Sequence, residues 1–234
     1  MSGLEEGFGF VMPHWLYWGW LAVMPLIMIA WENHTSKNAA PKPDQEDPAA
    51  ELLAEEDPLI RYGIKGNIVT RIIDCISEKS GLFIAFWTIN TVIFYFFEVV
   101  MRYLFNMPTI WVHEASFLLF GMQYLLAGAY AMLHGAHVRV DIVYNLLPDR
   151  GRVGMDVFTS IFFFIFALAL AGTSFRFFTD SYDMGETTVE TWGIQYWPVK
   201  GMMLLGAVLI LLAGLSKLIK DIMLFIEMGK EGAR

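Results

Sequence analysis

The chain has 234 residues, of which 56% are hydrophobic and only 17% are charged, and its mean hydropathy is +0.48. A soluble domain carries about a quarter of its residues as charged side chains, so this composition excludes an ordinary soluble protein. The net charge of −8, with no basic stripe, argues against a nucleic-acid partner, and the single cysteine, Cys75, excludes both an internal disulfide and a metal site built on several thiolates.

Five apolar blocks follow one another along the chain, each about as long as a bilayer is thick, roughly 20 residues at 1.5 Å per residue. None shows the alternating polarity of a barrel strand, so each is expected to be a helix. The blocks cover residues 11–31, 82–101, 110–133, 154–178 and 198–225. We therefore predict an all-α integral membrane protein. It has a four-helix transmembrane core at 82–226, interfacial amphipathic helices, one extra N-terminal transmembrane helix at 1–31 and a cytoplasmic tail at 227–234.

The first block could instead be a cleaved signal peptide, which carries a positively charged start and a small-residue cleavage site. The first ten residues contain Glu5 and Glu6 but no Lys or Arg, and no clean A-x-A site follows Trp31. We therefore expect this block to be retained as a transmembrane helix.

The segment between the first two blocks changes character near residue 59. Residues 32–58 are rich in Ala, Pro, Glu and Asp, which predicts a flexible acidic cytoplasmic linker. In residues 59–81 isoleucines recur every four positions, at Ile64, Ile68, Ile72 and Ile76, with basic residues between them. This pattern predicts an amphipathic helix in the interface plane. The alternative is an extended cytoplasmic end of the second helix.

The distribution of positive charge predicts the orientation, because cytoplasmic loops are enriched in Lys and Arg. If every block spans the bilayer, three of the 16 basic residues fall on one side, namely Arg102, Arg176 and Lys200, and 13 fall on the other. This asymmetry supports five helices, with the N-terminus outside and the C-terminus in the cytoplasm. Most tryptophans fall at predicted helix ends, where indole rings prefer the headgroup level.

Ionisable residues inside membrane segments are candidates for function. Glu98 and Arg102 are four residues apart and therefore share a helix face, and Glu114 lies one turn into the third block. Arg176 and Lys200 complete a set near the predicted outer interface. These residues are either interhelical ion pairs that fix the bundle or a polar patch for a partner or an ion path. The first reading is favoured for Glu98 and Arg102, and neither is favoured for Glu114.

The middle of the predicted bundle is almost free of charge, and its best polar candidates are Asn90, Thr91 and Gln123. None of them ionises, so the chain alone is not expected to carry a polar solute across. His113 lies about 30 Å from the pair His134 and His137 along one helix, so these residues cannot share a haem. No nucleophile–base set or metal cluster can be assembled, which argues against an enzyme and against any cofactor.

Two segments of the sequence point to a particular protein family, beyond the general character of a membrane protein. The first runs from Arg102 to Arg152 and contains HGAHVRVDIVYNLLPDRGR, and the second is ETWGIQYWPVKG, at 190–201. Together they resemble the small permease subunit (DctQ type) of tripartite ATP-independent periplasmic (TRAP) transporters, over about residues 65–226. The positions that match the family pattern are Arg102, Trp111, Glu114, His137, Val138, Val140, Asp141 and Pro148. The extra N-terminal helix and the linker depart from the four-helix layout of that family.

The resemblance implies a non-catalytic membrane subunit in a bacterial inner membrane. It would brace the scaffold of a large (M-type) permease subunit, which holds the sodium and substrate sites, while a periplasmic substrate-binding protein delivers a small solute, often a carboxylate. The expected interface residues are Arg102, Trp111, Glu114, His137, Arg139, Asp141, Glu190 and Lys200. Membrane lipids are also expected to contact the 137–141 element, as an interface helix in which His137 and Asp141 lie one turn apart. The alternatives are a membrane anchor of a redox enzyme, motivated by the histidines, and a self-sufficient small transporter.

Overall fold

The computed structural model describes residues 11–38, 66–135 and 147–231. In these residues the regular structure is helical, apart from one isolated antiparallel bridge between Thr187 and Gln195. The helices are α1 (His14–Asn38), α4 (Ile68–Ala85), α5 (Trp87–Leu104), α6 (Val112–Leu133), α8 (Asp149–Met184) and α9 (Trp197–Glu231). With α4 and α5 taken together, five segments are long and apolar enough to cross a membrane. The prediction of an all-α integral membrane protein is therefore confirmed.

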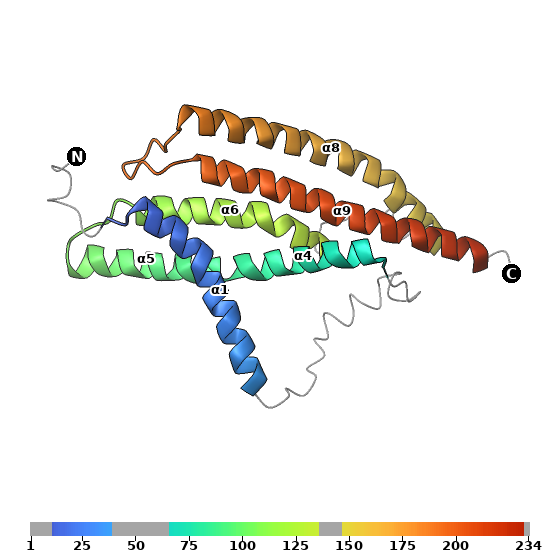
Figure 1. Cartoon of the computed structure of the whole chain (residues 1–234), viewed down its shortest axis with the longest axis horizontal. Coiled ribbons are helices and arrows are strands. Elements are labelled where there is room, and N and C mark those ends of the chain that lie inside the picture. The colour runs from blue at the N-terminus through green and yellow to red at the C-terminus, as the bar shows by residue number, and fades with distance from the viewer. Residues whose placement is uncertain (1–10, 39–65, 136–146, 232–234) are drawn as a thin grey trace.

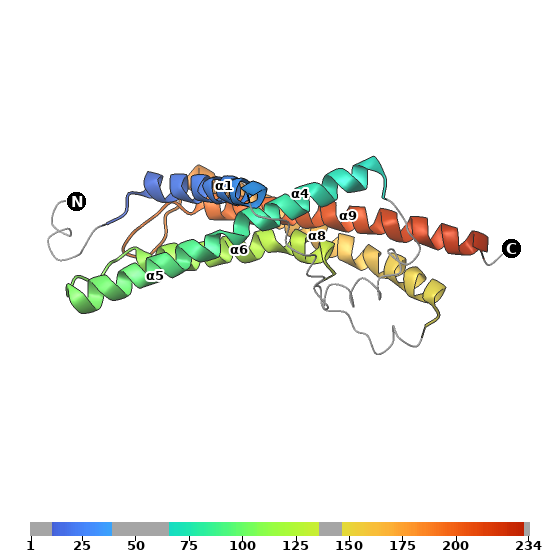
Figure 2. The same ribbon diagram turned by 90° about the horizontal axis from the view of Figure 1, so that it is seen from below.

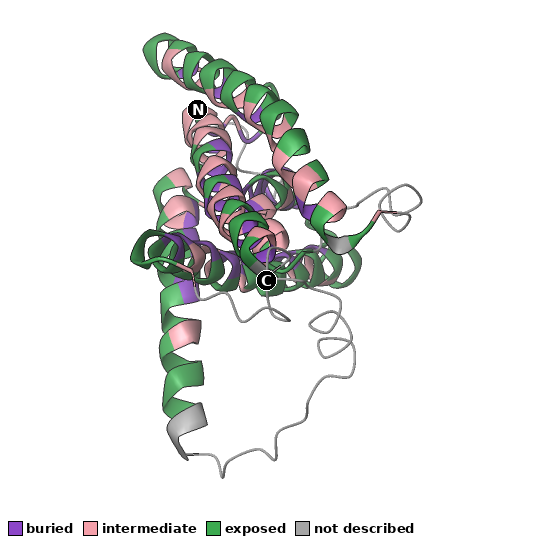
Figure 3. Cartoon of the chain, turned by 90° about the vertical axis from the view of Figure 1, so that its right-hand side faces the viewer, coloured by how far each residue is buried: buried purple, intermediate pink, exposed green. Residues whose placement is uncertain are grey.

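The long helices run side by side along the longest axis of the molecule (Figure 1). α9 packs between α8 on one side and α6 and α4 on the other, and α6 also packs on α5. α1 crosses the α4–α5 helix obliquely, and its C-terminal half leaves the bundle, as Figures 1 and 2 show from two directions. Viewed from the end in Figure 3, the buried residues lie between the helices, while the outward faces and the far half of α1 are exposed.

Helices α8 and α9 are longer than the blocks predicted from hydropathy. They contain 36 and 35 residues, which corresponds to about 54 Å at 1.5 Å per residue, against a hydrocarbon core of about 30 Å. The hydropathy pattern detects only the apolar part of each helix. The polar ends remain helical because they contact each other. Val153 of α8 forms a small buried cluster with Leu224 and Met228 of α9, and the Arg150 guanidinium lies 5.2 Å from the centre of the Phe225 ring. α8 ends at Gly185, whose φ of +61° is the left-handed conformation of a helix C-cap.

Helix α4 continues into α5 with an interruption only at Phe86, so that residues 68–104 form one long helical segment. The described part of the amphipathic 59–81 segment is thus helical and continuous with α5, as in the alternative that the sequence left open, while its position relative to the interface plane stays a prediction. Its small and polar side, with Thr70, Ser77 and Gly81, packs inward against α6 and α9. An added Cβ at Gly81 would lie 2.2 Å from the Tyr130 ring, so the ring fills the space that glycine leaves. Ile68, Ile72 and Ile76 of the pattern face outward, and Ile64 lies outside the described residues.

Helix α1 is joined to the core through its first turns. Tyr17 and Leu21 belong to the main buried cluster, and the Trp87 indole N–H donates a 2.9 Å hydrogen bond to the Leu21 carbonyl oxygen. Trp31, in the second half of the helix, is exposed. The helix extends to Asn38, seven residues beyond the predicted end at residue 31, so it includes the first part of the predicted linker. Residues 1–10 and 39–58 of the predicted N-terminal and linker segments lie outside the described residues.

Candidate functional site

Most of the interface residues expected from sequence gather at one end of the bundle. We call it the Trp111 end; it comprises the first turns of α1, the connection 105–111 and the connection 185–196 (Figure 1). Arg102 precedes the first connection, Trp111 and Glu114 begin α6, Glu190 lies in the second connection, and Lys200 lies in the first turn of α9. The other three expected residues, His137, Arg139 and Asp141, lie outside the described residues.

Trp111 is the centre of an aromatic cluster. Its ring centroid lies 5.4 Å from that of Phe94 in an edge-to-face arrangement, and 6.1 Å from those of Phe97 and Trp192. The side chain is 2% exposed, so the protein itself buries the ring. The cluster joins α5, the start of α6 and the connection 185–196, and so fixes the two connections relative to each other.

The first turns of α1 bind to the same cluster through polar atoms. The Tyr17 hydroxyl donates a 2.7 Å hydrogen bond to the Ala115 carbonyl oxygen, and the Trp192 indole N–H donates a 2.9 Å bond to the Met12 carbonyl oxygen. His14 Nε2 lies 3.1 Å from the Trp192 carbonyl oxygen. The extra N-terminal helix is therefore part of the Trp111 end and is not merely tethered to it.

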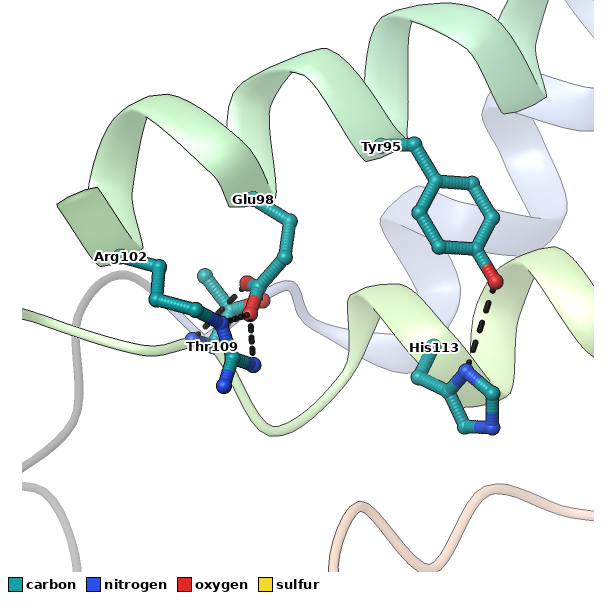
Figure 4. A network of polar contacts seen from close by, with 5 residues as sticks. All are labelled: Tyr95, Glu98, Arg102, Thr109 and His113. Atoms are coloured by element: carbon teal, nitrogen blue, oxygen red, sulfur yellow. Dashed lines mark hydrogen bonds and ion pairs between the residues drawn. The ribbon is translucent and has the colours of Figure 1, made fainter.

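Glu98 of α5 holds the connection 105–111 against that helix through hydrogen bonds (Figure 4). One carboxylate oxygen accepts a 2.9 Å hydrogen bond from Arg102 Nε, which confirms that the two residues share a helix face. The other accepts the Thr109 backbone N–H at 3.0 Å and also the Thr109 hydroxyl. A neighbouring contact joins the Tyr95 hydroxyl to His113 Nδ1 at 3.4 Å. The pair therefore orders a turn within one helix and its connection, whereas the structural reading of these charges expected ion pairs between helices.

Lys200 forms an ion pair with Glu186, which ties the start of α9 to the connection 185–196. The Lys200 ammonium also lies 5.3 Å from the centre of the Tyr196 ring. Its positive charge and hydrogen bond hold the pKa of the Glu186 carboxyl below its ordinary value of 4.5. Glu190 is exposed, and its backbone carbonyl accepts the Gly193 N–H at 3.2 Å. Arg176 is exposed on α8, within that helix rather than at its end.

Glu114 is the most deeply buried of the expected residues at this end after Trp111, with 5% of its surface exposed. One carboxylate oxygen accepts a hydrogen bond from the Thr188 hydroxyl. The residue lies in the first turn of α6, where the helix N-terminus favours a negative charge. Glu114 and Thr188 line a cavity of about 380 Å³ between α6 and the connection 185–196.

A second charged cluster, which the sequence analysis did not single out, lies at the opposite end of the bundle, the Asp74 end. Asp74 of α4 accepts hydrogen bonds of 2.7 Å from both Lys220 Nζ and the Ser216 hydroxyl of α9. Lys217 contacts Asp221 at 2.8 Å and Asp156 of α8 at 3.7 Å. The signal was present as polar residues spaced three and four apart in an apolar helix, a pattern typical of one helix face.

The three polar residues expected at mid-depth serve helix packing. Asn90 Oδ1 accepts a 2.8 Å hydrogen bond from the Trp20 indole of α1, and the Thr91 hydroxyl donates to the Trp87 carbonyl oxygen at 3.4 Å. Gln123 Nε2 donates a 2.7 Å bond to the Thr88 hydroxyl, which joins α6 to α5. No group of three or more His, Cys, Asp or Glu side chains arranged to hold a metal ion occurs in the described part of the chain.

Comparison with known proteins gives a family match for the part of the chain that holds this site. The family model described as "Tripartite ATP-independent periplasmic transporters, DctQ component" matches residues 91–223, more than half of the chain. A curated relative, the C4-dicarboxylate TRAP transporter small permease protein DctQ of Vibrio cholerae serotype O1, is 31% identical over 91 residues. That alignment covers 39% of this chain and 39% of the relative, so the chain spans well under half of the relative's length.

Proposed function

The chain belongs to the DctQ component family of tripartite ATP-independent periplasmic transporters, and we propose that it braces the large permease subunit during sodium-driven uptake of a small carboxylate. It is a multi-pass membrane protein and a transport component, not an enzyme. The large subunit would hold the sodium and substrate sites, and a periplasmic binding protein would deliver the solute. The family match over residues 91–223 carries this proposal.

The placement of charge within the bundle supports a bracing role. No Asp, Glu, Lys, Arg or His lies in residues 115–133 of α6, 157–175 of α8 or 201–216 of α9. A proton or ion path needs ionisable groups near the middle of the bilayer. The polar residues found there, Asn90, Thr91 and Gln123, bond to neighbouring helices or to their own helix. These side chains rigidify the bundle, which suits a subunit that stays still while its partner moves.

The outward surface of the bundle is also evidence for contact with a partner subunit or with lipid. α8 contributes an exposed row of large apolar side chains, Phe158, Ile161, Phe162, Ile165 and Phe166. Such a surface is stable only against lipid or against another membrane protein, because apolar patches of this extent are rare in contact with water. We assign part of it to the large permease subunit and the rest to lipid.

The function is tested by expressing the chain with and without the large permease subunit encoded in the same cell. We expect the two to co-purify in mild detergent. Proteoliposomes with both subunits should take up labelled succinate only with an inward sodium gradient and the binding protein. Liposomes with the small chain alone should not take up the label. Failure to co-purify, or uptake by the small chain alone, would contradict the proposal.

We further propose that the Trp111 end is periplasmic and the Asp74 end cytoplasmic, in a bacterial inner membrane. The charge asymmetry of the sequence supports this orientation. Val189 is fully exposed at the Trp111 end, and the single cysteine, Cys75, is exposed near the other end. With Cys75→Ser as background, Val189→Cys should react with a membrane-impermeant maleimide in spheroplasts. Native Cys75 should react only after the membrane is opened, and the reverse pattern would overturn the orientation.

A further inference from the structure

The cavity at the Trp111 end has an acidic lining. Three carboxylates contribute to it, namely Glu114 from α6 and Glu186 and Glu190 from the connection 185–196. The Lys200 ammonium is paired with Glu186, and His113, which also lines the cavity, contacts the Tyr95 hydroxyl through Nδ1. The lining therefore carries more negative than positive charge, and the ligand that complements it is a cation.

Glu114 supplies a second, independent indication of a ligand. Although 95% of this residue is buried, its Oε2 atom has no hydrogen-bond partner among the described residues, while Oε1 accepts the Thr188 hydroxyl. A buried acceptor without a partner destabilises the fold, and more so when it is charged. Because Oε2 is itself buried, a cationic donor in the cavity would satisfy this oxygen once the Glu114 carboxylate turns toward the cavity.

The shape and the donor set of the site favour an organic cation over a bare metal ion. The cavity of about 380 Å³ is more than ten times the roughly 30 Å³ that one water molecule occupies in the liquid. The described part of the chain contains no group of three acidic, His or Cys side chains arranged to hold a metal. An ammonium or guanidinium group on a side chain fills more of such a cavity and donates directional hydrogen bonds.

The surroundings of the cavity indicate where that side chain comes from. Phe117, three residues after Glu114, also lines the cavity and is 69% exposed on the outward side of α6. The same face continues along the helix to Gly121, where an added Cβ would meet nothing within 4 Å, and to the exposed Tyr124. The acidic cavity is thus continuous with an apolar, aromatic face of a membrane-spanning helix. A partner that covers both must itself lie in the membrane.

We propose that the cavity receives a lysine or arginine side chain of the large permease subunit, which pairs with Glu114 while a helix of that subunit covers Phe117 and Tyr124. This inference rests on the proposed function. It assigns Glu114 a specific role in assembly, which the sequence alone left undecided between structure and function.

The test uses the purified complex of the full chain with the large permease subunit, immobilised through a tag on the small subunit. The fraction of large subunit retained is measured across a potassium chloride titration for the wild type, for Glu114→Gln and for Glu78→Gln. Glu78 is an exposed glutamate of α4, near the opposite end of the bundle, and serves as the matched control. We expect Glu114→Gln to weaken retention by about tenfold or more and Glu78→Gln to leave it unchanged.

A charge-reversal experiment tests the same pairing even if the Glu114→Gln variant folds poorly. Glu114→Lys is combined with Lys→Glu or Arg→Glu changes at each basic residue near the periplasmic ends of the large subunit's helices. One combination should restore the complex. Retention equal to that of Glu78→Gln, or no restoring combination, overturns the assignment to the large subunit, as does an effect confined to capture of the binding protein. If the wild-type subunits do not co-purify at all, the proposed function itself fails.

Discussion

Gly206 of α9 packs directly against the backbone of α6, and this contact predicts the effect of one added methyl group. A Cβ at this position would lie 2.4 Å from the Leu125 carbonyl oxygen and 2.9 Å from its carbonyl carbon, both backbone atoms of α6. A carbon normally approaches a carbonyl oxygen to about 3.3 Å, so Gly206→Ala requires α6 and α9 to part locally by about 1 Å. Backbone atoms cannot rotate away as a side chain does. We expect a loss of about 1–3 kcal/mol in the free energy of unfolding, the usual range for overpacking.

The matched control is Gly172→Ala in the middle of α8, where an added Cβ meets nothing within 4 Å. Both variants replace glycine by alanine inside a long helix, so they share the change in helix propensity and differ in packing. Unfolding is measured by circular dichroism of the purified chain in mixed micelles titrated with sodium dodecyl sulfate. Gly206→Ala should unfold at a lower dodecyl sulfate fraction than the wild type, and Gly172→Ala at the same or a higher one. Equal midpoints for the two variants would refute the close packing of α6 on α9.

Tyr17→Phe should lower the free energy of unfolding by about 1 kcal/mol in the same assay, because it removes the buried hydrogen bond to the Ala115 carbonyl. The control is the exposed Trp15→Phe, and equal loss in both would speak against docking of α1. Asp74→Asn should cost about 1–2 kcal/mol because it weakens the contacts to Lys220 and Ser216, whereas Glu78→Gln should be neutral; a neutral Asp74→Asn would show that the cluster does not join α4 to α9. The lowered pKa of Glu186 means that its pairing stabilises the fold above pH 4.5, the ordinary value, and that this stability is lost as the pH falls through the lowered pKa. The gap in unfolding midpoint between the wild type and Lys200→Met should therefore shrink below pH 4.5, and a gap that stays constant down to pH 3 would contradict this.

The sequence predicted the helices well because apolar blocks of bilayer length have few alternatives to a helix. It misplaced their ends where the helix continues into polar residues. The ends of α8 and α9 persist through contacts such as that of Val153 with Leu224, which hydropathy does not report.

At the Trp111 end, sequence spacing predicted contacts within one helix and not those between distant segments. Glu98 and Arg102, four residues apart, pair as expected. The partner of Glu114 is 74 residues away at Thr188, and that of Tyr17 is 98 residues away at Ala115, so no local pattern indicates either. The docking of α1 was missed for the same reason.

The cluster of Val153, Leu224 and Met228 has a practical consequence for imaging this protein. Small membrane subunits are hard to align in electron micrographs because the detergent belt hides most of their mass. Here α8 and α9 are about 24 Å longer than the hydrocarbon core is thick, and they stay packed near their polar ends. A soluble domain fused to α9 through an uninterrupted helix would be held in a fixed orientation by the packed ends of α8 and α9. It would then serve as a fiducial marker outside the detergent belt.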